Sequence, residues 1–173
     1  MTPEEAFNFV VNLGLKRDQK SEQIIMADLK WAYMYAQDII KGRWLEAEPV
    51  IMKDPGWAYQ YALEIIGSRW RDAEPHIMTD PEWAYEYADK IIKGRWTEAE
   101  PVIMPSPEYA YKYSRNIIDG RWLEAEPVIM KDPCFAHLYA WDIIKGRWLE
   151  AEPVIMKDSF WWNIYKQYFN IDD

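Results

Sequence analysis

Residues 31–56 read WAYMYAQDIIKGRWLEAEPVIMKDPG, and residues 57–82 read WAYQYALEIIGSRWRDAEPHIMTDPE. Three further copies follow at 83–108, 109–134 and 135–160, with the same aromatic, Ala, Ile-Ile, Arg-Trp and Glu-Pro positions. A period of 26 residues is typical of solenoids, in which one repeat buries its apolar face only by stacking on its neighbours. This repeat decides the fold class.

Each copy predicts two helical segments. Segment A starts after an Asp-Pro pair, as at Asp54, because Asp can cap free N–H groups and Pro fits the first helical position. It runs from about Trp57 to Ile66, and its left-handed cap is expected at the glycine that follows in most copies. Those glycines are Gly42, Gly94, Gly120 and Gly146. Segment B starts near Arg-Trp and contains a proline, which predicts a short, kinked or partly 3₁₀ helix.

The predicted fold is an all-α, right-handed α-solenoid of short two-segment repeats that forms a single domain over residues 1–173. Residues 1–30 are a degenerate copy, in which Ala6, Phe7 and Phe9 match Ala-Tyr-x-Tyr, and they are expected to cap the N-terminal end. The full repeats are 31–56, 57–82, 83–108, 109–134 and 135–160. Residues 161–173 restart segment A and are expected to form a C-terminal capping helix.

Comparing the copies with one another separates a packing face of segment A from an exposed face. At ~100° per residue, the near-constant positions fill one broad arc and the varying positions a narrower one. The candidate partner-binding residues on this variable face are Met34, Leu63, Glu86, Asp89, Lys112 and Arg115.

The variable face becomes apolar in the last copy, at Leu138 and Trp141, and Ile164 and Tyr168 continue the same track. An aromatic anchor on an otherwise polar stripe favours contact with a protein partner, or a homodimer formed through this patch. The alternative is that the C-terminal segment folds over Trp141 and buries it.

Acidic residues recur in two rows behind the invariant arginines. The first row is Glu46, Asp72, Glu98, Glu124 and Glu150, and the second is Glu48, Glu74, Glu100, Glu126 and Glu152. Such a ladder could imitate the phosphate spacing of a nucleic acid. The structural interpretation, which we prefer, is a ladder of Arg–carboxylate pairs in which the arginine lies three residues before the first acid.

Composition excludes several classes of function. The net charge is −9, which disfavours direct binding to nucleic acid. Cys134 is the sole cysteine, so neither an intramolecular disulfide nor a multi-thiolate metal site can form. No signal peptide and no apolar run of membrane-spanning length are evident, which favours the cytoplasm. His76 and His137 replace residues that are Val or Tyr in most copies, which indicates sequence drift rather than catalysis or metal binding. We expect no enzyme activity and no cofactor.

The consensus WAYxYAxDIIKGRWxEAEPVIMKDP, carried nearly intact by residues 31–55, resembles a family of 26-residue helical repeats in hypothetical proteins of tailed bacteriophages and some bacteria. The resemblance covers residues 31–160. It implies a phage or prophage origin, hence the host cell cytoplasm, and it supplies no functional residues.

The sequence therefore predicts a non-enzymatic binding protein, a phage accessory protein that binds a host or defence protein through the variable face, with either inhibition or scaffolding as the result. The alternatives are an acidic nucleic-acid mimic that acts through the glutamate ladder, and a structural or self-assembling repeat protein.

Overall fold

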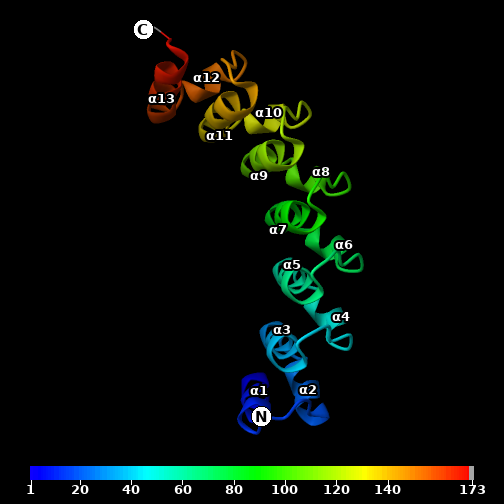
Figure 1. The fold of residues 1–173 in the computed structure, drawn as a ribbon. Coiled ribbons are helices and arrows are strands. Elements are labelled where there is room, and N and C mark those ends of the chain that lie inside the picture. The colour runs from blue at the N-terminus through cyan, green and yellow to red at the C-terminus, as the bar shows by residue number, and fades with distance from the viewer. Residues whose placement is uncertain (172–173) are drawn as a thin grey trace. The chain divides into compact units, whose positions relative to one another are not determined.

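The computed structural model describes residues 1–171, and every regular element in that range is helical. Helix pairs packed in succession make an all-α, solenoid-like repeat, which confirms the predicted fold class. The chain divides into two compact units, the first spanning Met1–Ile92 and the second starting at Lys93. Within each unit, the segment A helices lie along one side and the segment B helices and their loops along the other (Figure 1).

The first unit contains the degenerate copy and the first repeats. Its elements are α1 (Pro3–Asn12), α2 (Gln19–Ile25), α3 (Leu29–Tyr35), η1 (Ala36–Ile40), α4 (Glu48–Ile51), α5 (Pro55–Tyr61), η2 (Ala62–Ile66), α6 (Glu74–Ile77), α7 (Pro81–Tyr87) and η3 (Ala88–Ile92). Here η denotes a π-helical turn that continues the α-helix before it. In the full repeats, segment A is thus an α-helix plus a π turn, and segment B is a helix of four residues.

The second unit repeats the same alternation. Its elements are α8 (Glu100–Ile103), α9 (Pro107–Tyr113), η4 (Ser114–Ile118), α10 (Glu126–Ile129), α11 (Pro133–Tyr139), η5 (Ala140–Ile144), α12 (Glu152–Ile155) and α13 (Ser159–Phe169). The last helix, α13, takes the place of a segment A and stays α-helical throughout, without a π turn.

The predicted Asp-Pro helix starts are confirmed. The Asp54 carboxylate accepts a hydrogen bond from the Trp57 N–H at 2.9 Å, and Pro55 is the first helical residue. Ser106 caps α9 in the same way, which explains how one copy dispenses with the aspartate. Each cap satisfies N–H groups that the first helical turn leaves without a partner.

Segment B is short, as predicted, but its proline neither kinks nor interrupts it. Pro49 is the second residue of α4, and Pro127 is the second residue of α10. A missing N–H costs nothing at that position, because the first N–H groups of a helix have no intrahelical acceptor. The expectation of an interior proline was wrong because the helix starts at the second glutamate rather than near Arg-Trp.

The left-handed cap of segment A lies one residue earlier than expected. Lys41 has φ 56° and Gly67 has φ 68°, whereas Gly42 is outside the left-handed region. The π turn moves the cap, since Ala36 C=O accepts from the N–H groups of both Lys41 and Gly42. Only the second repeat places its glycine at the left-handed position and fills the next one with Ser68.

Two series of aromatic contacts form the core. Between copies, the Tyr33 and Trp57 rings are 5.2 Å apart, and Tyr59 and Trp83 are 5.5 Å apart. Within a copy, the Tyr61 and Trp70 rings are 5.0 Å apart. The Ile-Ile pair is half-buried in every repeat rather than fully packed, because the wider π turn rotates it relative to an α-helical phase.

The displaced cap leads to a test with a matched control. Gly67→Ala should destabilise the protein by about 1–2 kcal/mol, because a Cβ is strained at positive φ. Gly42→Ala should cost well under that, because its φ is not left-handed and an added Cβ has no atom within 4 Å. Urea unfolding followed by tryptophan fluorescence measures both, and equal losses would contradict this cap assignment.

Candidate functional site

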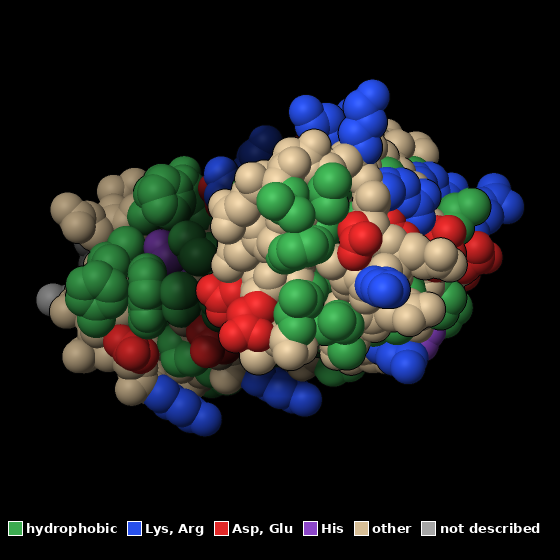
Figure 2. All heavy atoms as spheres, turned by 90° about the horizontal axis from the view of Figure 1, so that it is seen from below, with side chains coloured by type: hydrophobic (Ala, Val, Ile, Leu, Met, Phe, Trp, Pro, Cys, Tyr) green, Lys and Arg blue, Asp and Glu red, His purple; other side chains and the backbone are tan. Residues whose placement is uncertain are grey.

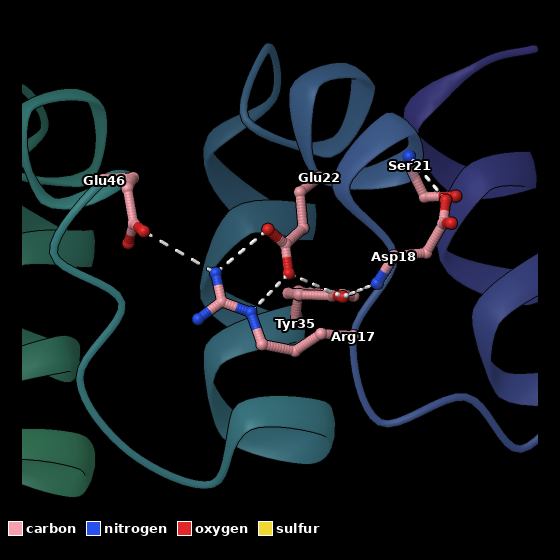
Figure 3. Close-up of polar contacts among 6 residues, drawn as sticks. All are labelled: Arg17, Asp18, Ser21, Glu22, Tyr35 and Glu46. Atoms are coloured by element: carbon pink, nitrogen blue, oxygen red, sulfur yellow. Dashed lines mark hydrogen bonds and ion pairs between the residues drawn. The ribbon is translucent and has the colours of Figure 1, made fainter.

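A polar network ties each segment B to the next segment A, and its first copy is drawn in Figure 3. Arg17 holds Glu22 through two hydrogen bonds, Nε to Oε1 at 2.7 Å and Nη2 to Oε2 at 2.9 Å. The Tyr35 hydroxyl donates to Glu22 Oε1 at 3.1 Å and accepts from the Asp18 N–H at 3.2 Å. The tyrosine thus joins the side chain and the backbone of the preceding copy.

The same network recurs at every joint inside the two units. The Arg–Glu–Tyr sets are Arg43, Glu48 and Tyr61; Arg69, Glu74 and Tyr87; Arg95, Glu100 and Tyr113; Arg121, Glu126 and Tyr139; and Arg147, Glu152 and Tyr165. In each of these sets the hydroxyl accepts the backbone N–H of the invariant tryptophan, as from Trp44 to Tyr61 at 2.6 Å.

The titration behaviour of these groups fits a structural role. Burial is the main cause that raises the pKa of Tyr61 to about 12, with the Glu48 carboxylate adding to it. Hydrogen bonds from Arg147 are the main cause that lowers the pKa of Glu152. These shifts keep the Tyr61 phenol neutral and the Glu152 carboxylate charged near neutral pH, so neither of these two groups is poised for proton transfer.

The network divides the predicted acidic ladder into two rows with different surroundings. The second row is buried or half-buried and paired with arginine, whereas the first row is exposed to solvent: Glu46, Asp72, Glu98, Glu124 and Glu150. The arginine therefore pairs with the acid five residues on rather than the acid three residues on. A mimic would have to act mainly through the first row.

The comparison of the repeats did not predict that Arg17 and Glu22 form the first copy of the network, nor that Tyr35 belongs to it. Arg17 and Glu22 lie 26 residues before Arg43 and Glu48, so extending the period into residues 1–30 would have found them. The role of Tyr35 had no such signal, because a buried tyrosine of a repeat is ordinarily explained by ring packing alone.

The variable face contributes contacts between neighbouring copies. Glu64 accepts hydrogen bonds at 2.8 Å from Gln37 and from Tyr33, both in the preceding copy. Asp142 accepts from Tyr111 and pairs with Arg115 at 3.3 Å. Arg115 is exposed, while the other predicted contact residues of this face are half-buried: Met34, Leu63, Glu86, Asp89 and Lys112.

Pockets lie where neighbouring copies meet along the variable face. One of 280 Å³ is lined by Gln37, Lys41, Glu64 and their neighbours. The hollow beside the N-terminal copy is larger, 550 Å³, and has Val11, Leu15 and Ile40 among its lining residues. It is wider there because α1 ends at Asn12 without the π turn that the full repeats place at this point.

Two of the four predicted patch residues, Trp141 and Tyr168, lie together at the surface of the second unit. The rings of Trp141 and Tyr168 are 5.0 Å apart, and these residues are 41% and 48% exposed. Leu138 and Ile164 are half-buried. Hydrophobic side chains gather over these last helices at the left of Figure 2. The C-terminal helix α13 therefore packs beside Trp141 without covering it.

The described residues contain few candidates for a metal ligand set or a reactive nucleophile. Among residues 1–171, no cluster of three or more His, Cys, Asp and Glu side chains is arranged to hold a metal ion. Burial raises the pKa of the Cys134 thiol, which disfavours the reactive thiolate. In the same range, no helix combines the length and the apolar character that crossing a bilayer requires.

Comparison of the chain with protein-family models, with curated proteins and with solved structures gives no match.

The tyrosine network is tested by a pair of variants on one helix. Tyr61→Phe should cost about 1–3 kcal/mol, because it leaves the buried Trp44 N–H without an acceptor. Tyr59→Phe, two residues earlier and also buried, should cost less than about 1 kcal/mol, because no hydrogen bond of its hydroxyl is lost. Chemical denaturation compares the two, and a smaller loss for Tyr61→Phe would contradict the network's importance.

Proposed function

We propose that this protein is a non-enzymatic binding protein that engages a protein partner through the variable face of its repeats, with Trp141 and Tyr168 as the principal anchor. The observation that carries the proposal is this aromatic pair, in ring contact and almost half exposed on a face that is mostly polar in other copies. Exposed aromatic side chains of this kind are enriched among the residues that dominate binding energy.

Two structural features support binding over catalysis. The Arg, Glu and Tyr side chains that recur in every full repeat bind one another in the Arg–Glu–Tyr network. The residues that differ between repeats are mostly at exposed or half-buried positions. Two of the joints also have hollows lined by different side chains, so these joints offer different surfaces on the same scaffold. Solenoids commonly use such extended surfaces for recognition.

We further propose, from the resemblance to phage repeat proteins, that the protein acts in the host cytoplasm, where it would bind and inhibit a host or defence protein. The rival function is nucleic-acid mimicry by the exposed acidic row, of which Glu46 has a side chain 61% exposed. A self-assembling role through the same aromatic patch is the third candidate.

Substitution of the anchor, compared with an equally apolar site elsewhere, tests the proposal. Trp141→Lys should preserve the fold, because other copies have Gln37, Asp89 and Arg115 at this position. It should weaken capture of a host protein by about 30-fold, since the loss of an anchor costs roughly 2 kcal/mol. Leu149→Lys changes a side chain that is 62% exposed outside the patch and should leave capture unchanged.

The rival functions give different results in the same assay. A mimic would lose its partner steeply as salt rises and on neutralising Glu46 and Asp72, with Trp141→Lys having little effect. A self-assembling protein would change its size with concentration in light scattering, and Trp141→Lys would abolish that change. If both lysine variants bind as the parent does, the anchor assignment is wrong.

A further inference from the structure

One titratable side chain of the second unit is buried without a hydrogen-bond partner for its Nδ1. His137 is 1% exposed, and its Nδ1 has no acceptor or donor within reach. The other full repeats have tyrosine here, at Tyr33, Tyr59, Tyr85 and Tyr111. The last full repeat therefore differs from the others in having, at this position, a side chain that can change its charge near neutral pH.

The surroundings of His137 are aromatic and come from two elements besides its own helix. Its ring centroid lies 5.8 Å from Trp141 of η5, 5.5 Å from Trp161 and 6.0 Å from Tyr165. Trp161 and Tyr165 both belong to α13. Docking of α13 against α11 is therefore part of what removes the imidazole from water.

Protonation of the His137 imidazole opposes the packing of α13 against α11. In the neutral ring with its proton on Nε2, the buried Nδ1 leaves only a lone pair unpaired. Protonation would place an N–H without an acceptor, and a positive charge, among the rings of Trp141, Trp161 and Tyr165. Burial accordingly lowers the pKa of His137, and the Asp142 carboxylate opposes this as the smaller cause.

The charged groups on the neighbouring elements are engaged elsewhere. Asp142 accepts from Tyr111 and pairs with Arg115 at 3.3 Å. The acids within the neighbouring helices are Glu152 of α12, bound to Arg147; Glu126 of α10, bound to Arg121; and Glu108 of α9, bound to Lys112. The helix-capping carboxylates Asp132 and Asp158 accept backbone N–H groups of α11 and α13. The charged side chain of α13 is Lys166, which is itself cationic. None of these contacts offers the imidazolium a dedicated carboxylate.

We propose that His137 is a pH-sensitive latch for α13: the neutral imidazole holds α13 against α11, and protonation releases it. Because the folded-state pKa lies below the ordinary value of about 6.5, docking is fully stabilised above that pH and weakens as the pH falls below it. Release would carry Tyr168 away from Trp141. The latch itself does not depend on the proposed function, although its effect on partner binding does.

Hydrogen exchange of the intact chain tests the latch without any partner. Mass spectrometry would follow peptides from α13 between pH 7.5 and pH 5.0, with rates corrected for the intrinsic pH dependence of exchange. Protection of α13 should fall by up to about tenfold per pH unit below ~6.5, while peptides from α3 and α5 serve as internal references. Glu152 does not interfere, since its lowered pKa places its titration below this window.

Two variants separate the latch from general acid sensitivity. His137→Tyr restores the residue of the other repeats, and His137→Phe keeps an uncharged ring. In both, protection of α13 should be independent of pH between 6.5 and 5.0. An equal fall in the parent and the variants, or no fall in the parent, would overturn the latch.

A second measurement on the unchanged protein covers the case in which the variants do not fold. The imidazole resonance of His137 in a proton NMR titration, assigned with His76→Gln, should report a pKa below 6.5, and a higher value would overturn the latch. Loss of partner capture in Trp141→Lys is a separate readout. The proposed function can therefore fail while the latch stands, and the reverse.

Discussion

The hydroxyl of one tyrosine per repeat holds successive copies together inside each unit. The Tyr61 hydroxyl accepts a hydrogen bond from the Trp44 N–H at 2.6 Å and donates one to Glu48. Arg43 donates two further hydrogen bonds of 2.8 Å to the same carboxylate. These contacts satisfy a buried backbone donor and a nearly buried carboxylate together, so removal of one partner leaves the others unpaired. The four-residue segment B helices cannot be stable alone and depend on this connection.

This network explains which positions of the repeat are constant and which are free to vary. Arg, Trp, the second Glu and the fifth-position Tyr are retained because each has a partner in the network. The exposed end of segment A has only local contacts between neighbours, such as Gln37 with Glu64, and these can be exchanged one pair at a time. A rigid joint beside an exchangeable surface suits a scaffold for recognition.

The last repeat and α13 use the same geometry with different side chains. His137 stands where tyrosine stands elsewhere, Trp141 replaces a polar residue, and α13 ends with Asn170 in the left-handed conformation without a π turn. The result is an aromatic cluster that is partly exposed at Trp141 and Tyr168 and sealed at His137. The proposed interaction surface and a buried titratable group thus both contact one helix, α13.

The sequence alone determined the period, the all-α class, the helix starts at Asp54 and its equivalents, and the apolar track from Trp141 to Tyr168. These follow from local capping chemistry and from spacing, which need no knowledge of distant contacts. Tertiary structure decided the π turn, the left-handed Lys41, the pairing of Arg43 with Glu48 rather than Glu46, and the buried His137. The setting of Glu48 and the burial of His137 depend on where the next copy places a hydroxyl or an aromatic ring, and a pattern within one repeat does not contain that information.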